Sequence, residues 1–260
     1  MSRVTWEKAQ RITLRNVMQM SSGLEYKHDP TGNAIYWAAD RFATALEPNL
    51  VAPPGTRFQY SDGDVSLTGA VVASASGRSL YGFAQTALFD KLQMANHFWA
   101  FVDGAGRFPG GWGLRLRPMD MAKLGQLYLQ NGEWNGGRIF GPAYRDLAWT
   151  PGISRLYGLH WWIGNAQEGK GVAYFVASGF KGQKIYVFPS LGIVAAMTAS
   201  LPGLEETKAN GLIVAALLAA AKSSHGGDEG MAQASLNELE KRGFRGITRI
   251  GQEAQDTPRR

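Results

Sequence analysis

The sequence predicts an α+β fold in which an antiparallel sheet is flanked by helices. Four β-rich segments separated by short turns follow one another between residues 157 and 199. An alanine- and leucine-rich segment at 205–222 is typical of a helix that covers one face of such a sheet. The earlier sequence carries apolar residues at helical spacing. We therefore expect a helical lobe over 12–150, and a sheet with its last helix over 155–222.

Capping residues and apolar spacings divide the helical lobe into elements. Thr13 is expected to cap a short helix that runs to Met20, and a second helical pattern extends from 33 to 46. Further helices are expected at 64–75, closed by Gly77, after a cap at Ser79, and from Pro118. The pairs Asn131-Gly132 and Asn135-Gly136 then indicate a tight turn or small hairpin.

The sheet and the tail complete the chain. The four strands are expected at 157–163, 172–177, 183–188 and 193–199. Residues 223–260 are polar and carry few apolar anchors, so we expect a partly disordered tail with some helix around 232–242.

Composition restricts the classes of partner. The chain has 260 residues, a formal net charge of +6 and 45% hydrophobic residues, as expected for a globular domain. No five or six Lys or Arg residues stand together, so nucleic-acid binding is not expected. With no cysteine, a disulfide framework and a thiolate nucleophile are excluded.

The sequence gives little indication of cellular location or of a cofactor. The opening residues 1–8 lack the apolar run of a signal peptide, and no later segment is long and apolar enough to span a membrane. As written, the sequence predicts a cytoplasmic chain with no membrane span, although the location of its parent protein stays open. The four histidines have no metal-ligand spacing, so neither a metal nor a cofactor is expected.

The stretch from Pro54 to Asp62 places a tyrosine and a carboxylate two residues apart just before a helix. A free phenol has a pKa of about 10, so Tyr60 is a poor base unless a nearby cation lowers that value. With such a cation, Tyr60 could transfer protons in a hydrolytic reaction. The alternative is structural, with Tyr60 at a strand end and Asp62 capping the helix.

A second stretch, Ala177-Ser178-Gly179, lies near the end of a predicted strand. A glycine there would let a substrate approach the strand backbone closely, with an amide N–H directed at a developing oxyanion. The alternative is a hairpin glycine with no ligand. A third stretch is the glycine-rich loop 110–114, whose Trp112 is either a cleft residue or a packing residue.

In their order along the chain, the three stretches resemble serine hydrolases related to class C β-lactamases, penicillin-binding proteins and aminohexanoate-dimer hydrolases. The resemblance covers about 12–200 and implies a β-lactamase/transpeptidase-like fold. It also implies acyl transfer from an amide, ester or β-lactam to a serine and then to water. The implied catalytic residues are Tyr60 as general base and acid, Asp62 in place of the asparagine of Tyr-x-Asn, and Phe180 as the backbone N–H donor to the oxyanion. The implied substrate-binding residues are Ser178, Gly179 and Trp112.

The nucleophile of that family lies in a Ser-x-x-Lys helix, for which this sequence offers one match, Ser178 to Lys181. Residues three apart share a face on a helix but point to opposite faces on a strand, so we interpret this match as fortuitous. The Gly-x-Ser-x-Gly pattern of other serine esterases does not occur. We therefore expect a chain truncated before its nucleophile, without the opening helix and two strands.

Such a loss would expose a sheet edge and favour self-association. The isolated chain is then expected to be inactive. Two alternatives stay open: a noncatalytic remnant or ligand-binding module of the same fold, and a second chain that supplies Ser-x-x-Lys. The substrate, which we expect to be a small amide, ester or β-lactam, is not specified further by the sequence.

Overall fold

The computed structural model of the chain describes residues 7, 10–26, 34–166 and 171–223. These residues form two compact units, each made from two stretches of sequence. The first comprises the described residues up to Arg117 together with Asp146–His160, and the second comprises Pro118–Arg145 together with the described residues from Trp161 to Ser223. The helix predicted around 232–242 and the tail after residue 223 lie outside the described residues.

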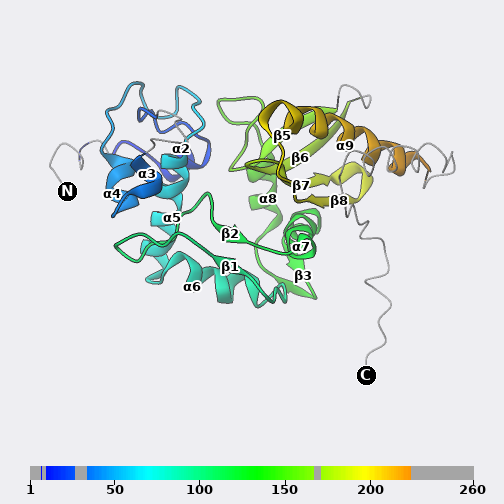
Figure 1. The fold of residues 1–260 in the computed structure, drawn as a ribbon, viewed down its shortest axis with the longest axis horizontal. Helices are drawn as coiled ribbons and strands as arrows, with labels where there is room; N and C mark the ends of the chain where they lie inside the picture. The colour runs from blue at the N-terminus through cyan, green and yellow to red at the C-terminus, as the bar shows by residue number, and fades with distance from the viewer. Residues whose placement is uncertain (1–6, 8–9, 27–33, 167–170, 224–260) are drawn as a thin grey trace. The chain divides into compact units, whose positions relative to one another are not determined.

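Short helices open the first unit (Figure 1). Helix α2 covers Leu14–Met18, and Thr13 caps it as predicted, because its side chain accepts from the backbone N–H of Asn16 while Asn16 reciprocates. The single helix predicted at 33–46 is wrong, since the chain forms α3 (Ala34–Trp37) and α4 (Arg41–Leu46). Asp40 separates them by adopting an extended conformation and accepting from the backbone N–H groups of Phe42 and Ala43.

The longest helix of the first unit is α5, Asp62–Ser76. It begins two residues earlier than predicted, because Ser61 rather than a later residue caps it through the N–H of Asp64. Gly77 ends it in the left-handed conformation with φ 65°, as predicted. Ser79 caps α6 (Leu80–Ala84), also as predicted, and a π-helical turn, Gln85–Phe89, continues it.

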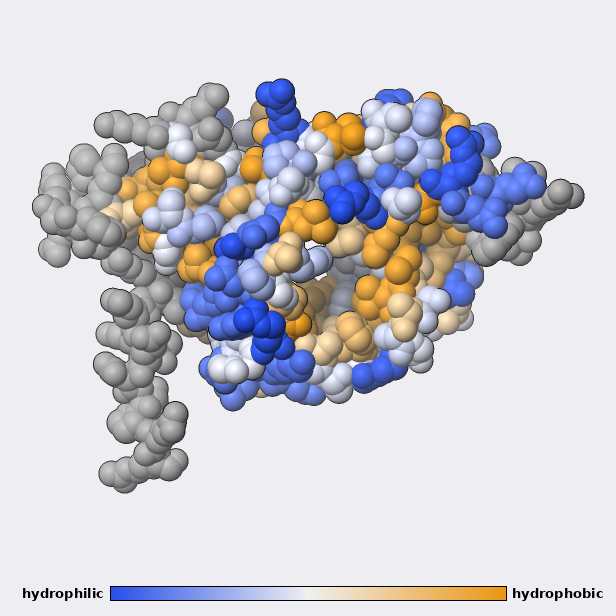
Figure 2. All heavy atoms as spheres, turned by 180° about the vertical axis from the view of Figure 1, so that it is seen from behind, coloured by the Kyte–Doolittle hydropathy of each residue, from blue (hydrophilic) through white to orange (hydrophobic). Residues whose placement is uncertain are grey.

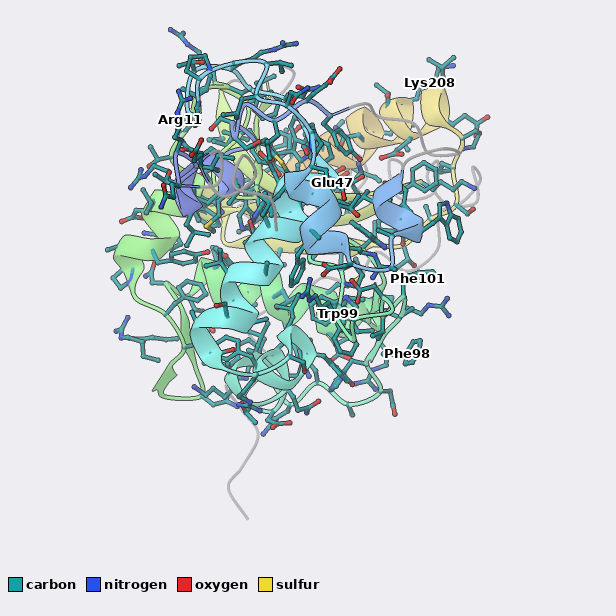
Figure 3. The ribbon with its side chains drawn as sticks, turned by 90° about the vertical axis from the view of Figure 1, so that its left-hand side faces the viewer. Arg11, Glu47, Phe98, Trp99, Phe101 and Lys208 are labelled. Carbon is teal, nitrogen blue, oxygen red and sulfur yellow. The ribbon has the colours of Figure 1, made fainter. Side chains whose placement is uncertain are left out.

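A two-stranded ribbon of β1 (Phe98–Trp99) and β2 (Leu114–Arg115) follows in the same unit. Trp99 is anchored inward, since its indole N–H donates to the carbonyls of Pro109 and Trp112. Phe98 and Phe101 are instead 58% and 57% exposed, and Figure 3 shows both side chains at the periphery of the ribbon.

The second unit contains an antiparallel four-stranded sheet in the order β5-β6-β7-β8. Its strands are Trp162–Ala166, Val172–Gly179, Gln183–Phe188 and Ile193–Met197. The predicted strand at 157–163 is largely wrong, because His160 has a positive φ of 58° and the N–H of Leu159 bonds to Ala148 instead of a neighbouring strand. Helix α8, Pro142–Trp149, contains the 145–146 boundary between the two units and was not predicted.

Helices cover this sheet as the predicted layer architecture requires (Figure 1). Helix α9, Gly203–Ser223, buries Ile213, Val214 and Leu217 in one cluster with Tyr186 and Phe188 of β7. Helix α7, Pro118–Leu129, packs on β7 and β8, whose Ile185, Val187 and Val194 lie against its Gly125. A Cβ at Gly125 would lie 2.6 Å from Val194 Cγ1, so this glycine sets the close approach of α7.

The predicted hairpin after α7 is confirmed. Strand β3 (Glu133–Trp134) pairs with β4 (Gly137–Arg138), and the four predicted Asn and Gly turn residues all have positive φ.

On the face shown in Figure 2, hydrophobic residues reach the surface in separate patches interrupted by hydrophilic ones. Within the described part of the chain, no helix combines the length and apolar composition needed to cross a membrane.

Candidate active site

The residues predicted from the sequence fall into two groups, each within one compact unit. Tyr60, Asp62 and Trp112 belong to the first unit, whereas the Ser178–Phe180 segment belongs to the second. The start of α5 positions the first group, because the Ser61 cap places Asp62 at the first helical position with Tyr60 immediately before the cap.

Two tyrosines hold the Asp62 carboxylate. Tyr26 Oη donates to Asp62 Oδ2 at 2.8 Å, and Tyr36 Oη makes a short hydrogen bond to the same oxygen. Burial, followed by the hydrogen bond and charge of Asp62, raises the pKa of both phenols well above the ordinary value. Both tyrosines therefore stay protonated and act as donors at physiological pH. We call Asp62, Tyr26 and Tyr36 the Asp62 centre.

Tyr60 lies beside the Asp62 centre and is 38% exposed. Its ring meets that of Tyr157 edge-on, with 6.1 Å between the ring centroids. Burial and, to a smaller extent, the charge of Asp62 raise the pKa of Tyr60 above 10.0. Both influences favour the neutral phenol, so proton abstraction by Tyr60 would require a cation to be brought to it.

Asp64 is a second carboxylate of the same helix turn, and only 1% of it is exposed. Its Oδ2 accepts from the backbone N–H of Ser22 at 3.2 Å, and its Oδ1 has no partner among the described residues. Burial raises the pKa of Asp64 to about 7, against a smaller opposing effect of the Ser22 hydrogen bonds. Burial therefore favours the protonated carboxylic acid of Asp64 over its carboxylate.

Trp112 lies close to the Asp62 centre through Tyr36. The two rings meet edge-on with 4.9 Å between their centroids, and the Arg41 guanidinium lies over the indole at 5.6 Å. Arg41 is 4% exposed and donates to the backbone carbonyls of Phe101 and Tyr36. Trp112 thus has a packing role, and its predicted contact with substrate stays a prediction.

In the second unit, Ser178 lies near the end of β6, and Lys181 follows in the turn with a positive φ of 61°. The expectation that this Ser-x-x-Lys match lies in a strand or turn and not in a helix is confirmed, because β6 ends at Gly179 and Phe180 and Lys181 lie in the turn. The lysine that reaches the serine is Lys184, which is the cross-strand partner of Ser178 and donates from Nζ to Ser178 Oγ at 2.5 Å. Lys184 also pairs with Glu206 Oε1 of α9 at 2.7 Å.

These side chains line a pocket of about 230 Å³ between the sheet and α9. The other lining residues include Trp162, Val176 and Asn210. Gly179 has a structural reason to be glycine, because an added Cβ would lie 2.9 Å from Gln183 Cβ across the hairpin. The Phe180 side chain is 79% exposed at the turn. Its backbone N–H as an oxyanion donor stays a prediction.

Sequence reasoning missed Tyr26, Tyr36, Asp64 and Lys184. Of these four residues, only Lys184 could have been found from the sequence, because a short turn after Gly179 determines which residue of β7 lies opposite Ser178. Among the described residues, no group of three His, Asp or Glu side chains is arranged to hold a metal ion.

Comparisons with known proteins place this geometry in context. Residues 5–220 match the family described as Beta-lactamase. A search of curated proteins finds no significant match. Among solved structures, a protein assigned as a 6-aminohexanoate-dimer hydrolase from Bacillus anthracis is 24% identical with a TM-score of 0.65, covering 78% of this chain and 60% of its own. A beta-lactamase from Mycobacterium bovis is 19% identical with a TM-score of 0.60, covering 80% of this chain and 74% of its own.

An octameric penicillin-binding protein homologue from Pyrococcus abyssi is 20% identical with a TM-score of 0.56, covering 73% of this chain and 54% of its own. This chain thus spans less than two thirds of the length of the Bacillus and Pyrococcus proteins. The structural matches show the fold, and the predicted β-lactamase/transpeptidase-like α+β architecture is confirmed. Because the family match extends over most of the sequence, the chain belongs to the Beta-lactamase family.

Proposed function

We propose that this chain provides the proton-transfer and substrate-binding part of a serine hydrolase that acts on an amide, ester or β-lactam. The family is generally one of serine hydrolases, and the Asp62 centre is the observation that carries the proposal. Two neutral donors hold a carboxylate at the start of α5, two residues after Tyr60, which is the tyrosine that the family resemblance makes catalytic.

The reaction has two steps, acylation of the serine and hydrolysis of the acyl-serine, and each step forms two bonds and breaks two. A serine oxygen attacks the carbonyl carbon and gives up its proton, and the leaving nitrogen or oxygen accepts a proton as its bond to carbon breaks. Water then attacks the acyl-serine and releases the acid. In this scheme Tyr60 carries the proton between the serine and the leaving group, and the Phe180 N–H stabilises the developing oxyanion.

The Ser-x-x-Lys match in this sequence does not identify the nucleophilic serine. The one Ser-x-x-Lys match ends in a hairpin turn, and Lys184 bonds to Ser178 while also forming an ion pair with Glu206. An ion-paired ammonium is a poor base for activating a serine. We therefore propose that turnover requires a serine and a lysine on a helix that these 260 residues do not supply.

A ligand-binding module without turnover is the second candidate. The raised pKa of Tyr60 favours it, because a phenol that retains its proton can bind a substrate carbonyl but cannot abstract a proton. Self-association is a further proposal. Strands β5 and β8 form the two edges of the described sheet, and one similar structure is octameric.

The test is the intact mass of the purified chain after treatment with a fluorophosphonate probe, alone and mixed with a polypeptide that spans the Ser-x-x-Lys helix of a family relative. We expect no adduct on this chain alone, and ester hydrolysis in the mixture that Tyr60→Phe reduces but Tyr81→Phe does not. A stoichiometric adduct on Ser178 would instead make the chain self-sufficient. Ligand binding without labelling or hydrolysis in either sample would favour the binding module.

A further inference from the structure

We propose that the pocket between the sheet and α9 binds a small neutral molecule that carries a carboxamide group. The proposal goes beyond the acyl-transfer function, since Ser178 alone among the lining residues belongs to the predicted substrate-binding set. All of the residues that line this pocket lie in the second unit. Its volume of about 230 Å³ is below the range of about 300–1,000 Å³ for drug-sized ligands, so the pocket suits a small molecule.

The pocket interrupts the apolar packing of α9 on the sheet. Val176 of β6 is buried in one cluster with Leu217 of α9. Ser178 follows two residues later on the same strand and therefore points to the same face of the sheet. Opposite Ser178, α9 presents Glu206 and Asn210, which line the pocket. Polar groups thus stand at a sheet–helix interface that is apolar farther along.

Lys184 and Glu206 give the pocket a balanced pair of charges. Lys184 Nζ donates to Glu206 Oε1 at 2.7 Å, and the two side chains are 8% and 23% exposed. An anionic ligand would gain the attraction of Lys184 but meet the repulsion of Glu206, and a cationic ligand would meet the reverse. A neutral ligand leaves the pair intact and brings no further charge out of water.

Asn210 supplies a donor whose orientation is fixed by a buried partner. Its Oδ1 accepts from Tyr186 Oη at 2.7 Å, and Tyr186 is fully buried. Burial chiefly raises the pKa of Tyr186, so its phenol keeps its proton and stays a donor. The Asn210 oxygen is therefore occupied. The Asn210 Nδ2 group makes no hydrogen bond to any residue that the structure describes.

The remaining hydrogen-bonding groups match a carboxamide. Asn210 Nδ2 and the Ser178 hydroxyl can donate to a ligand oxygen, and Glu206 Oε2, which lies outside the ion pair, can accept from a ligand N–H. A carboxamide offers one acceptor oxygen and one donor nitrogen, whereas a carboxylate offers only acceptors and an amidinium only donors. Trp162 and Val176 provide apolar surface for the rest of the molecule.

The experiment compares benzamide, benzoate and benzamidinium, three planar ligands of nearly the same shape that are neutral, anionic and cationic at pH 7. The full chain is labelled with ¹⁵N, and binding is followed by NMR through the indole N–H signal of Trp162, which Trp162→Phe assigns. We expect benzamide to shift this signal and to bind about tenfold or more tightly than either charged ligand, because each of those leaves a group of the pocket unpaired.

Three variants assign the binding to this pocket. Asn210→Asp keeps the acceptor for Tyr186 but removes the Nδ2 donor, and should weaken benzamide binding about tenfold. Ser178→Ala removes the second donor without changing the charge, and should weaken it about three- to tenfold. Asn135→Asp makes the same chemical change as Asn210→Asp at an exposed turn of the same unit, and should leave the Kd unchanged. Circular dichroism checks that each variant is folded.

Each outcome decides the inference. Benzamide binding that is weakened in Asn210→Asp or Ser178→Ala and kept in Asn135→Asp supports it. Benzoate or benzamidinium binding as tightly as benzamide overturns the neutral class of ligand. Benzamide binding that survives in both folded pocket variants overturns the location, and no shift with any ligand shows that the pocket is only a gap beside a structural ion pair. The acyl-transfer proposal stands or falls separately, by fluorophosphonate labelling.

Discussion

Asp64 and His160 are two buried titratable residues whose pKa values are shifted in opposite directions. Burial raises the pKa of Asp64 from 3.8 to about 7, and burial lowers that of His160 from 6.5 to about 4. The folded state thus holds the Asp64 proton more tightly than the unfolded state, so this residue's contribution to stability falls as pH rises from about 4 to about 7. The His160 contribution instead rises with pH from about 4 to about 6.5, because the unfolded state takes up the proton first.

We predict that Asp64→Asn removes the pH dependence that Asp64 gives to the free energy of unfolding and leaves that of His160. Each shift of about three pKa units corresponds to about 4 kcal/mol, so the two slopes nearly cancel in the unsubstituted chain below pH 6.5. Asparagine can still accept from the Ser22 N–H but does not titrate. The free energy of unfolding of Asp64→Asn should therefore rise with pH between about 4 and 6.5, and exceed that of the unsubstituted chain at pH 8.

The measurement is urea unfolding of both proteins from pH 4 to 8, with Asp90→Asn as the control for a change in net charge. If Asp64→Asn and the unsubstituted chain show parallel pH profiles, folding does not raise the pKa of Asp64 and the prediction is wrong. Tyr60 is likewise a poor base by itself, because burial and the charge of Asp62 favour its protonated phenol.

At the scale of elements, Lys184 ties β7 to α9. Its ammonium contacts Ser178 and Glu206, and the side chains of Lys184 and Glu206 are 8% and 23% exposed. Lys184→Met should destabilise the chain by about 3 kcal/mol, because it leaves Glu206 and the Ser178 hydroxyl without their buried partner. In the double variant Lys184→Met/Glu206→Gln part of this loss should return, since no unpaired charge remains.

Chemical denaturation of the unsubstituted chain, Lys184→Met, Glu206→Gln and the double variant measures the coupling free energy between Lys184 and Glu206. Glu205→Gln is the matched control, because Glu205 lies in the same helical turn but is exposed, and its effect should stay within about 0.5 kcal/mol. Strictly additive effects of the two substitutions would contradict a direct interaction between Lys184 and Glu206.

At the scale of the whole molecule, the chain passes between the two units at 117–118, 145–146 and 160–161. Helix α7 therefore belongs to the sheet unit, although it follows the helices of the first unit in sequence. Gly125→Ala should destabilise this unit by about 1–3 kcal/mol, because the new methyl group would overlap Val194 and Ile185. Hydrogen exchange should accelerate in α7, β7, β8 and α9 more than in α5.

Gly211→Ala in α9 is the control for this prediction. Apart from the neighbouring backbone of α9 itself, no atom lies within 4 Å of a Cβ added at Gly211, so the substitution should stabilise the helix by about 0.5–1 kcal/mol. Equal acceleration of α5 and the sheet in Gly125→Ala would show that the two units unfold as one.

The α+β class, the caps at Thr13 and Ser79, the stop at Gly77 and most of the sheet could be predicted from the sequence. These features depend on neighbours within a few residues, because a cap, a turn or an alternating strand is specified by local hydrogen bonds and side-chain periodicity. The family motifs around Tyr60 and Ser178 were readable for the same reason. Local patterns failed where a distant contact decides, as at Tyr157–Trp161, which is folded back on Ala148 instead of pairing as a strand.

The chemistry of the site, in contrast, depends on contacts that form only when the chain has folded. The donors to Asp62 come from Tyr26 and Tyr36, which are 36 and 26 residues away and belong to no motif. The lysine that reaches Ser178 is Lys184 across the hairpin and not Lys181 in the Ser-x-x-Lys match. Hydrogen bonds and pKa shifts depend on distances of a few ångströms and on burial, and folding sets both by packing segments that the sequence keeps apart.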